Sequence, residues 1–154
     1  MIKKLALALV LAASVPLTTE TSVTATEDYP VRKIWGKGTA ACPEKSICLY
    51  QDSNYNEDSH EGRGRWIWVV TGPTARIPGG NDEASSLHAN LEGTPWETAA
   101  FCEDTNFQGG TLLYLVDGAS RPNLKRVGGH QVNLNDMISS VNLLAGDWRR
   151  PCSA

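Results

Sequence analysis

Short apolar runs rich in β-branched and aromatic residues recur along the chain, and clusters of Gly, Pro, Asn and Asp separate them. This spacing is typical of strands joined by turns. No long window keeps the apolar period of a helix, and frequent glycines would interrupt one. The pattern therefore predicts an all-β fold, with at most a helical turn near residues 134–138. The predicted strands are residues 47–50, 66–71, 86–89, 99–102, 111–116 and 140–144.

The first residues follow a different pattern. Lys3 and Lys4 precede an apolar stretch at residues 5–17, which passes into polar sequence rich in Thr, Ser and Ala. This is the layout of a secretory signal peptide, and the apolar stretch is shorter than the roughly 20 residues of a membrane-spanning helix. A small-residue cleavage site fits before Thr26 and also after Ala12. We expect residues 1–25 to be a signal peptide, and the mature protein to be secreted without a membrane partner.

The remaining chain is long enough for one compact core and short for two independent domains. Its composition is weakly acidic, because the sequence holds 14 Lys and Arg against 17 Asp and Glu. No basic block could neutralise a run of phosphates. We therefore expect one domain, a monomer, with no nucleic-acid partner.

All four cysteines follow the predicted signal peptide, and disulfides persist in exported proteins. Four cysteines allow three pairings. Cys42 and Cys48 enclose only a short loop, which favours a Cys42–Cys48 bridge and leaves Cys102–Cys152 as the second. Zinc is the competing interpretation, but the histidines are scattered and no paired Cys-x-x-Cys spacing exists.

The chain also repeats itself, which bears directly on the fold. Residues 49–57 match residues 101–109, with Asp, Asn and an aromatic residue at the same offsets. Residues 81–86 and 135–140 share the pattern Asn-Asp-x-x-Ser-Ser. Both pairs of segments keep their order and nearly their separation, so one internal duplication explains both matches.

The repeated Asn-Asp-x-x-Ser-Ser segment carries the chemistry of a cation site. Calcium takes six to eight oxygens from carboxylates, amides, backbone carbonyls, hydroxyls and water. Asp82 with Ser85, and Asp136 with Ser139, offer such oxygens within one tight loop. Asn, Asp and Ser also make ordinary turns by bonding their own backbone, but two copies at equivalent places favour a binding role.

With these motifs in view, the chain resembles the microbial βγ-crystallins. That family combines a Tyr-x-x-x-Asn-aromatic-x-Gly segment near the first hairpin of each motif with an Asn/Asp-Asn/Asp-x-x-Ser/Thr-Ser segment near its end. The resemblance implies a two-motif Greek-key β-sandwich. It divides the chain into an N-terminal extension at 26–41, which we expect to be flexible, and a domain at 42–154 with motif 1 at about 42–92, motif 2 at about 98–144 and a C-terminal tail.

In that family each calcium ion is shared between the loop of one motif and a backbone carbonyl in the first hairpin of the other. The resemblance therefore implies two calcium sites. The first would combine Asn81, Asp82 and Ser85 with Glu103. The second would combine Asn135, Asp136 and Ser139 with Gln51.

Two residues depart from the family pattern. Glu57 stands where the family has a glycine with a left-handed backbone, so the first hairpin must either be strained or take another shape. This makes the site that includes Gln51 the weaker one. Cys102 replaces an aromatic residue of the second motif and is available for the bridge to Cys152.

A second resemblance covers residues 42–90. The run Cys-Pro…Cys-Leu-Tyr followed by Asn-Asp-x-Ala-Ser-Ser is similar to secreted proteins of peptidase inhibitor family I36. Membership implies inhibition of an extracellular metallopeptidase. A structural or stress-resistant secreted protein, and a toxin-like or cell-wall-binding module, remain open as alternatives, because an inhibitory loop is a local addition to a fold that hosts other roles.

Catalysis finds little support in the sequence. No serine lies in a Gly-x-Ser-x-Gly motif, and His60 is interpreted as a solvated loop residue. Trp66 and Trp68 alternate along a predicted strand and would share one face. Core packing is expected for at least one of them, and an exposed pair could stack on sugar rings.

Overall fold

The computed structural model describes residues 30–59, 63–127, 132–146 and 149–153. The predicted signal peptide, His60 and His130 lie outside these residues. Within them the chain forms two antiparallel sheets, with short 3-10 turns η1 (Thr39–Ala41), η2 (Asn54–Asn56) and η4 (Thr105–Phe107). No helix of the described part is long and apolar enough to cross a bilayer. The predicted all-β class is therefore confirmed.

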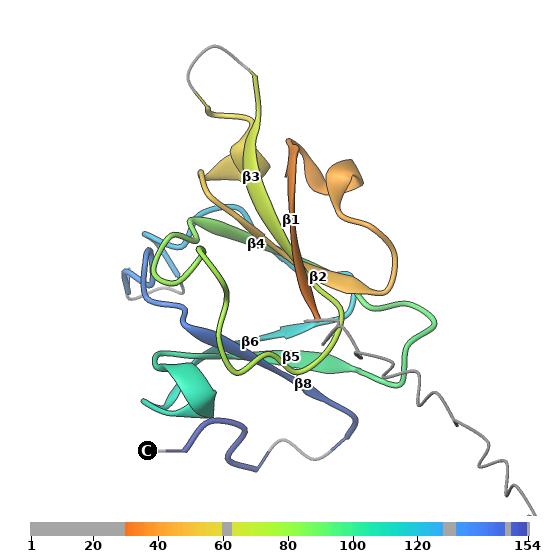
Figure 1. Cartoon of the computed structure of the whole chain (residues 1–154), viewed down its shortest axis with the longest axis vertical. Helices are drawn as coiled ribbons and strands as arrows, with labels where there is room; N and C mark the ends of the chain where they lie inside the picture. The colour runs from red at the N-terminus through yellow and green to blue at the C-terminus, as the bar shows by residue number, and fades with distance from the viewer. Residues whose placement is uncertain (1–29, 60–62, 128–131, 147–148, 154) are drawn as a thin grey trace, which may run out of the picture.

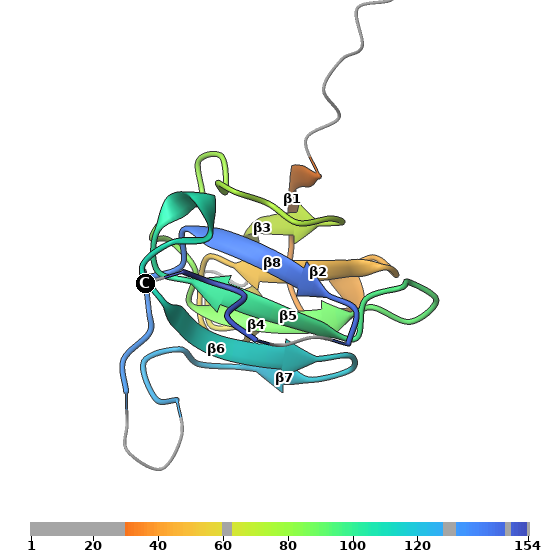
Figure 2. The ribbon, with the colours of Figure 1, turned by 90° about the horizontal axis from the view of Figure 1, so that it is seen from below.

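The two sheets pack face to face (Figure 1). The first sheet has the order β1-β3-β2-β4-β7, and the second has the order β6-β5-β8, as Figure 2 shows from below. The strands of the first sheet are β1 (Val31–Gly36), β2 (Ser46–Tyr50), β3 (Arg65–Val70), β4 (Ser86–Asn90) and β7 (Ser120–Arg121). Those of the second are β5 (Thr98–Cys102), β6 (Thr111–Val116) and β8 (Ser140–Leu144).

Each motif gives one segment to the sheet of the other. The short strand β7 of the second motif pairs with β4 of the first, where Leu87 lies opposite Arg121. In the same way Thr74 of the first motif bridges to Val141 in β8 of the second. This exchange brings the two Asn-Asp loops together: the amide of Asp82 donates to the carbonyl of Ile138 at 3.3 Å. The candidate site therefore depends on both motifs at once.

The core lies between the sheets, because alternate residues of each strand point inward. Trp68 and Leu49 from the first sheet are fully buried there with Phe101 from the second. A smaller cluster covers the outer face of the first sheet, where Tyr50 packs with the first disulfide. The prediction that at least one of Trp66 and Trp68 packs in the core is confirmed for Trp68.

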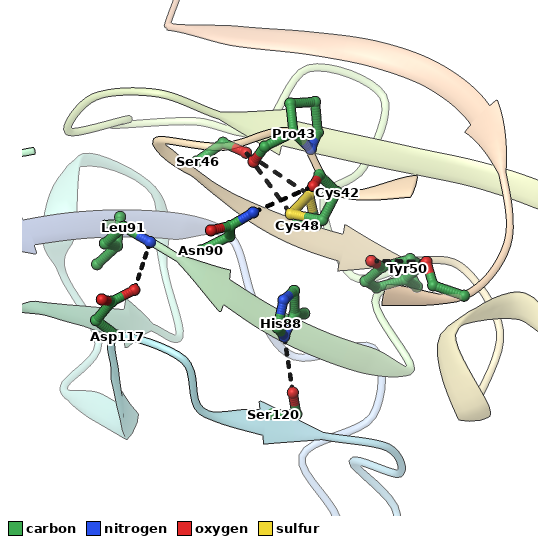
Figure 3. Close-up of a disulfide and its surroundings, with 11 residues drawn as sticks. Cys42, Pro43, Ser46, Cys48, Tyr50, His88, Asn90, Leu91, Asp117 and Ser120 are labelled. Carbon is green, nitrogen blue, oxygen red and sulfur yellow. Dashed lines mark hydrogen bonds between the residues drawn. A yellow bond between two sulfur atoms is a disulfide. The ribbon is translucent and has the colours of Figure 1, made fainter. Parts of the chain in front are cut away.

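Both predicted disulfides are present. Cys42 and Cys48 are joined with their Cα atoms 5.8 Å apart, and Cys102 and Cys152 with theirs 5.7 Å apart. Figure 3 shows the first bridge, beside which the hydroxyl of Ser46 donates to the carbonyl of Pro43 at 2.6 Å. The second bridge fastens the C-terminal tail to β5. Cys102 thus exchanges the area of an aromatic side chain for a covalent link.

Two expectations about local structure are wrong. Val31–Gly36 was predicted to lie in a flexible extension, but it forms β1 and pairs along its whole length with β3. The consecutive charges of Arg32 and Lys33 hid the alternation of a half-exposed edge strand. The helical turn expected near residues 134–138 is instead a tight turn, because Asp136 has a φ of 57°, which a right-handed helix does not allow.

Candidate functional site

The second serine of each Asn-Asp-x-x-Ser-Ser segment fastens a hairpin. Ser86 Oγ donates to the carbonyl of Asp52 at 2.7 Å and accepts from the amide of Tyr55 at 3.0 Å. Ser140 Oγ makes the equivalent bonds to Asp104 at 2.6 Å and from Phe107 at 3.2 Å. These hydroxyls are therefore occupied by the fold, and the first serine of each segment is the one available to a ligand.

Each Asn-Asp pair forms a turn with a left-handed backbone. Asp82 and Asp136 both have a φ of 57°, a region that Asp and Asn tolerate better than most residues. The side-chain amide of Asn81 donates to Asp82 Oδ2 at 2.6 Å, and Asn135 makes the same bond to Asp136. The turn thus holds its carboxylate next to an amide oxygen, which is a suitable arrangement for a hard cation.

Residues of both Asn-Asp turns and of the second hairpin line a first cleft of about 380 Å³. Ser139 Oγ donates to Asp82 Oδ1 at 3.3 Å, across the boundary between the motifs. The amide of Ser139 donates to the carbonyl of Cys102 at 3.1 Å, which places its side chain beside Glu103. The lining residues are Asn81, Asp82, Glu103, Asp104, Thr105, Asp136, Met137 and Ser139.

A second cleft of about 180 Å³ lies at the equivalent place in the other half. The amide of Ser85 donates to the carbonyl of Tyr50 at 2.8 Å. This bond places Ser85 close to Gln51, the residue that follows Tyr50. Two buried oxygens here have no hydrogen-bond partner among the residues that the structure describes, Gln51 Oε1 and Asn135 Oδ1. The lining residues are Asp52, Ser53, Asp58, Arg65, Ser85, Lys125 and Asn135.

The grouping expected from the sequence is corrected in one respect. Ser85 was assigned to the turn of Asn81 and Asp82, but it lines the second cleft with Asn135. Ser139 lines the first cleft with Asp82. The reason is that each first serine is bonded back to the first hairpin of its own motif, whereas each Asn-Asp turn reaches across to the other.

The two clefts differ in charge. Four carboxylates line the first cleft, and its described lining contains no Lys or Arg. The carboxylates belong to Asp82, Glu103, Asp104 and Asp136. In the second cleft, Arg65 Nε lies 3.1 Å from Asp52 Oδ2, and Lys125 lies in the same lining. The positive charges of Arg65 and Lys125 thus lie beside the carboxylates of the second cleft, whereas the described lining of the first cleft contains no Lys or Arg.

The oxygen donors that line the first cleft are of the kinds that a hard divalent cation takes. Within the described ranges, no group of three or more His, Cys, Asp or Glu side chains is arranged to hold a metal on its own. An ion here would instead combine carboxylate oxygen from Asp82 with the hydroxyl of Ser139, the amide oxygen of Asn81 and the backbone carbonyl of Glu103. This mixture of oxygen donors suits calcium better than zinc, which takes nitrogen and sulfur.

The left-handed backbone expected at Glu57 lies instead at the residues before it. Glu57 has a φ of −74°, whereas Asn54, Tyr55 and Asn56 have φ values of 50°, 56° and 66°. Asn56 is buried, and its Oδ1 accepts from the amide of Asp52 at 2.8 Å. Its Nδ2 donates to the carbonyls of Gly36 and Trp66, both at 3.1 Å. Asn56 therefore fixes the backbone beside Gln51, a role that sequence reasoning missed.

The second hairpin keeps the glycine that the family pattern requires. Gly109 has a φ of 78°, and a Cβ atom there would lie 2.7 Å from Asp104 Oδ2. Because glycine has no Cβ atom, the carboxylate of Asp104 can lie close to the backbone of Gly109. Asp104 directly follows Glu103 in the chain.

A histidine on the outer face of the first sheet holds the exchanged strand. His88 Nδ1 and Ser120 Oγ lie 2.7 Å apart and join β4 to β7 (Figure 3). Burial lowers the pKa of His88 from its ordinary value of 6.5, although the nearby carboxylate of Asp117 opposes this shift. Burial thus favours the neutral imidazole at this position.

The match to one solved structure agrees with the architecture. One solved structure, from work on the evolution of the eye-lens βγ-crystallin domain fold, is 26% identical with a TM-score of 0.53, and the match covers 76% of this chain and 99% of that chain. A βγ-crystallin domain from Clostridium beijerinckii is 22% identical with a TM-score of 0.42, covering 66% of this chain and 99% of the other. No curated protein matches at a significant level.

The family comparison is more specific. The model of peptidase inhibitor family I36 matches residues 37–114, which span the first motif and the β5–β6 hairpin of the second. The matched segment is half of the 154 residues. With its two-motif βγ-crystallin fold, this chain belongs to peptidase inhibitor family I36.

Proposed function

We propose that this protein is a secreted inhibitor of an extracellular peptidase, and that calcium stabilises its fold. The family match over residues 37–114 is the observation that carries the inhibitory role. Secretion is supported by two disulfides, which persist in oxidising compartments, and by the predicted signal peptide.

The fold suits an inhibitor that must survive among peptidases. Cleavage in the native state requires local opening, and segments with few buried contacts open first. Here one bridge closes the Cys42–Cys48 loop and the other ties down the C-terminal tail through Cys152. The side chain of Asn90 also donates to the carbonyl of Cys42 at 3.3 Å. These links reduce the opening that a peptidase needs.

The inhibitory role is tested with purified protein against a panel of secreted metallopeptidases and serine peptidases, using casein hydrolysis as the readout. We expect at least one enzyme to be inhibited at micromolar or lower concentration. Protein that has been reduced and alkylated serves as the control, because it should lose inhibition with its fold. An absence of inhibition across both classes contradicts the proposal.

The calcium role rests on the first cleft. An ion there would offset the repulsion among its carboxylates and would link Asp82 of one motif to Ser139 of the other. Extracellular calcium modules bind with dissociation constants of about 10⁻⁴–10⁻³ M. An ion at one hundred times its dissociation constant adds about 2.7 kcal/mol to the free energy of unfolding.

Thermal unfolding in chelator and in calcium tests this role, with magnesium as the control for charge screening. We expect calcium to raise the melting temperature by several degrees, and magnesium to raise it less, because magnesium demands a tighter octahedral shell. Asp82→Asn should remove most of the calcium effect. Equal shifts with calcium and magnesium, in both the wild type and Asp82→Asn, would show that the effect is not specific binding.

A further inference from the structure

An aromatic pair lies exposed at one edge of the first sheet. Trp35 in β1 stands opposite Trp66 in β3, and their rings meet edge to face with centroids 5.0 Å apart. Their exposed fractions are 54% and 38%. The ends of β1 and β3 that carry them extend away from the second sheet (Figure 1), so this face is not covered as it is around Trp68.

A lysine is held against these rings. Lys33 lies two positions before Trp35 on the same face of β1, and its Nζ is 4.7 Å from the ring centroid of Trp66. It is also 4.8 Å from the ring of Trp68 and 3.5 Å from the carbonyl of Gly79. Aromatic faces hold an ammonium in place without neutralising it. Lys33 is therefore held in place beside the two rings.

A groove of about 580 Å³ continues from the lysine along the same face of β1. Val31 and Pro78 give it apolar walls, and Arg76 is exposed on its rim. We call the whole region the aromatic–basic surface, and it consists of Val31, Lys33, Trp35, Trp66, Arg76 and Pro78.

The charge of this region is opposite to that of the whole chain. The aromatic–basic surface contains Lys33 and Arg76 and no Asp or Glu, whereas the net charge of the whole chain is −3. A partner that docks here would therefore be negatively charged.

We propose that the aromatic–basic surface is the docking site for the inhibited peptidase, and that it receives an apolar patch of the enzyme bordered by carboxylates. This inference rests on the proposed inhibitory function. Tryptophan and arginine are the residues that most often dominate protein interfaces. Trp35 Nε1 already donates to the carbonyl of Arg63 at 2.8 Å, so covering the ring leaves no polar group without a partner.

The Cys42–Cys48 loop is the competing surface, because it is exposed and closed by a disulfide. Its exposed residue Lys45 has a φ of 62°. A left-handed residue at this place interrupts the extended backbone with which a peptide adds to a strand of its partner. The loop therefore lacks the backbone shape of a bound substrate, whereas the aromatic–basic surface needs no such shape.

The test uses the peptidase of the panel that the full chain inhibits most strongly. Trp35→Ala, Trp66→Ala and the double variant Lys33→Glu with Arg76→Glu should each raise the inhibition constant at least about tenfold. Raising the salt concentration should weaken the wild type and leave the double variant less affected. Arg121→Glu, which changes the same kind of charge on the opposite edge strand, and Lys45→Ala are the controls. Melting curves establish that each variant folds.

The outcomes separate the two proposals. If the wild type inhibits a peptidase while the three surface variants stay within twofold of it, the docking site is wrong and the inhibitory function stands. A loss confined to Lys45→Ala places the contact on the disulfide loop and also overturns the inference. Binding to insoluble peptidoglycan that disappears in both tryptophan variants, with inhibition unchanged, would make this a sugar-binding surface instead. If the wild type inhibits nothing, both proposals fail.

Discussion

Ser139 Oγ donates a hydrogen bond to Asp82 Oδ1, although the two residues stand 57 positions apart. They belong to different motifs: the amide of Ser139 donates to Cys102 of its own motif, whereas the amide of Asp82 donates to Ile138 of the other. An ion that binds both would therefore act as a clasp between the motifs, so calcium affinity and the stability of the pairing should change together.

Ser139→Ala should remove the tighter phase of a calcium titration, because Ser139 lines the acidic first cleft. Ser85→Ala should remove only the weaker phase, since Ser85 lines the cleft that contains Arg65 and Lys125. Isothermal titration calorimetry of the two variants and the wild type measures both phases. The assignment is wrong if Ser85→Ala abolishes the tighter event.

Arg65→Gln should strengthen calcium binding in the second cleft. Arg65 Nε now lies 3.1 Å from Asp52 Oδ2, and replacing the guanidinium with a neutral side chain releases that carboxylate and removes a repelling charge. We expect the weaker dissociation constant to fall several-fold in the same calorimetric titration. Arg121→Gln is the matched control, because it removes one charge away from the cleft; an equal gain in both variants would show only a change in net charge.

Acidification should loosen the contact between β4 and β7. The folded-state pKa of His88 is lowered by burial, so the unfolded chain binds more protons once the pH falls below the ordinary value of 6.5. With respect to His88, the free energy of unfolding therefore has its full value above that pH and declines as the pH falls below it. Urea unfolding at several pH values between about 5 and 7.5 should show this slope, and His88→Gln should flatten it. A slope that is the same in the variant would assign it to other groups.

The two disulfides should contribute unequally to stability. The chain-entropy estimate gives about 4 kcal/mol for the Cys102–Cys152 bridge, which closes a separation of 50 residues. It gives about 2 kcal/mol for Cys42–Cys48, which closes a separation of 6. Chemical unfolding of the two double-serine variants measures the difference. A larger loss for the Cys42–Cys48 pair would mean that packing in the outer cluster outweighs loop entropy.

The repeat explains why much of this fold could be predicted. The duplicated segments specify two equivalent halves, and the strand predicted at residues 140–144 is β8 to the residue. Short loops made the first bridge predictable. By contrast, β7 is only two residues long, Ser120–Arg121, and carries no apolar pattern.

The candidate residues could be named only in part, and their arrangement could not be predicted. The sequence named seven of the residues that line the two clefts, because their types and spacing suit a cation, but not Asp52, Asp58, Arg65 or Lys125 of the second cleft. It could not assign Ser85 and Ser139 to the correct clefts, since that depends on where β4 and β8 begin relative to the facing turns. Asn56 was missed because its role depends on its burial. Its side-chain oxygen accepts a hydrogen bond from the amide of Asp52, as a backbone carbonyl would, but in the sequence it looks like any turn residue.

The exchange of β7 and of the segment at Thr74 between sheets has a historical consequence. One motif alone would leave unpaired strand edges and an open core, so an ancestor with a single copy could have been stable only as two identical chains wrapped around each other. Joining the copies in one gene replaced an association that depends on protein concentration with a covalent link between the two motifs. It also lets each half change on its own, and the two clefts do differ: carboxylates line the first, and the second contains an arginine.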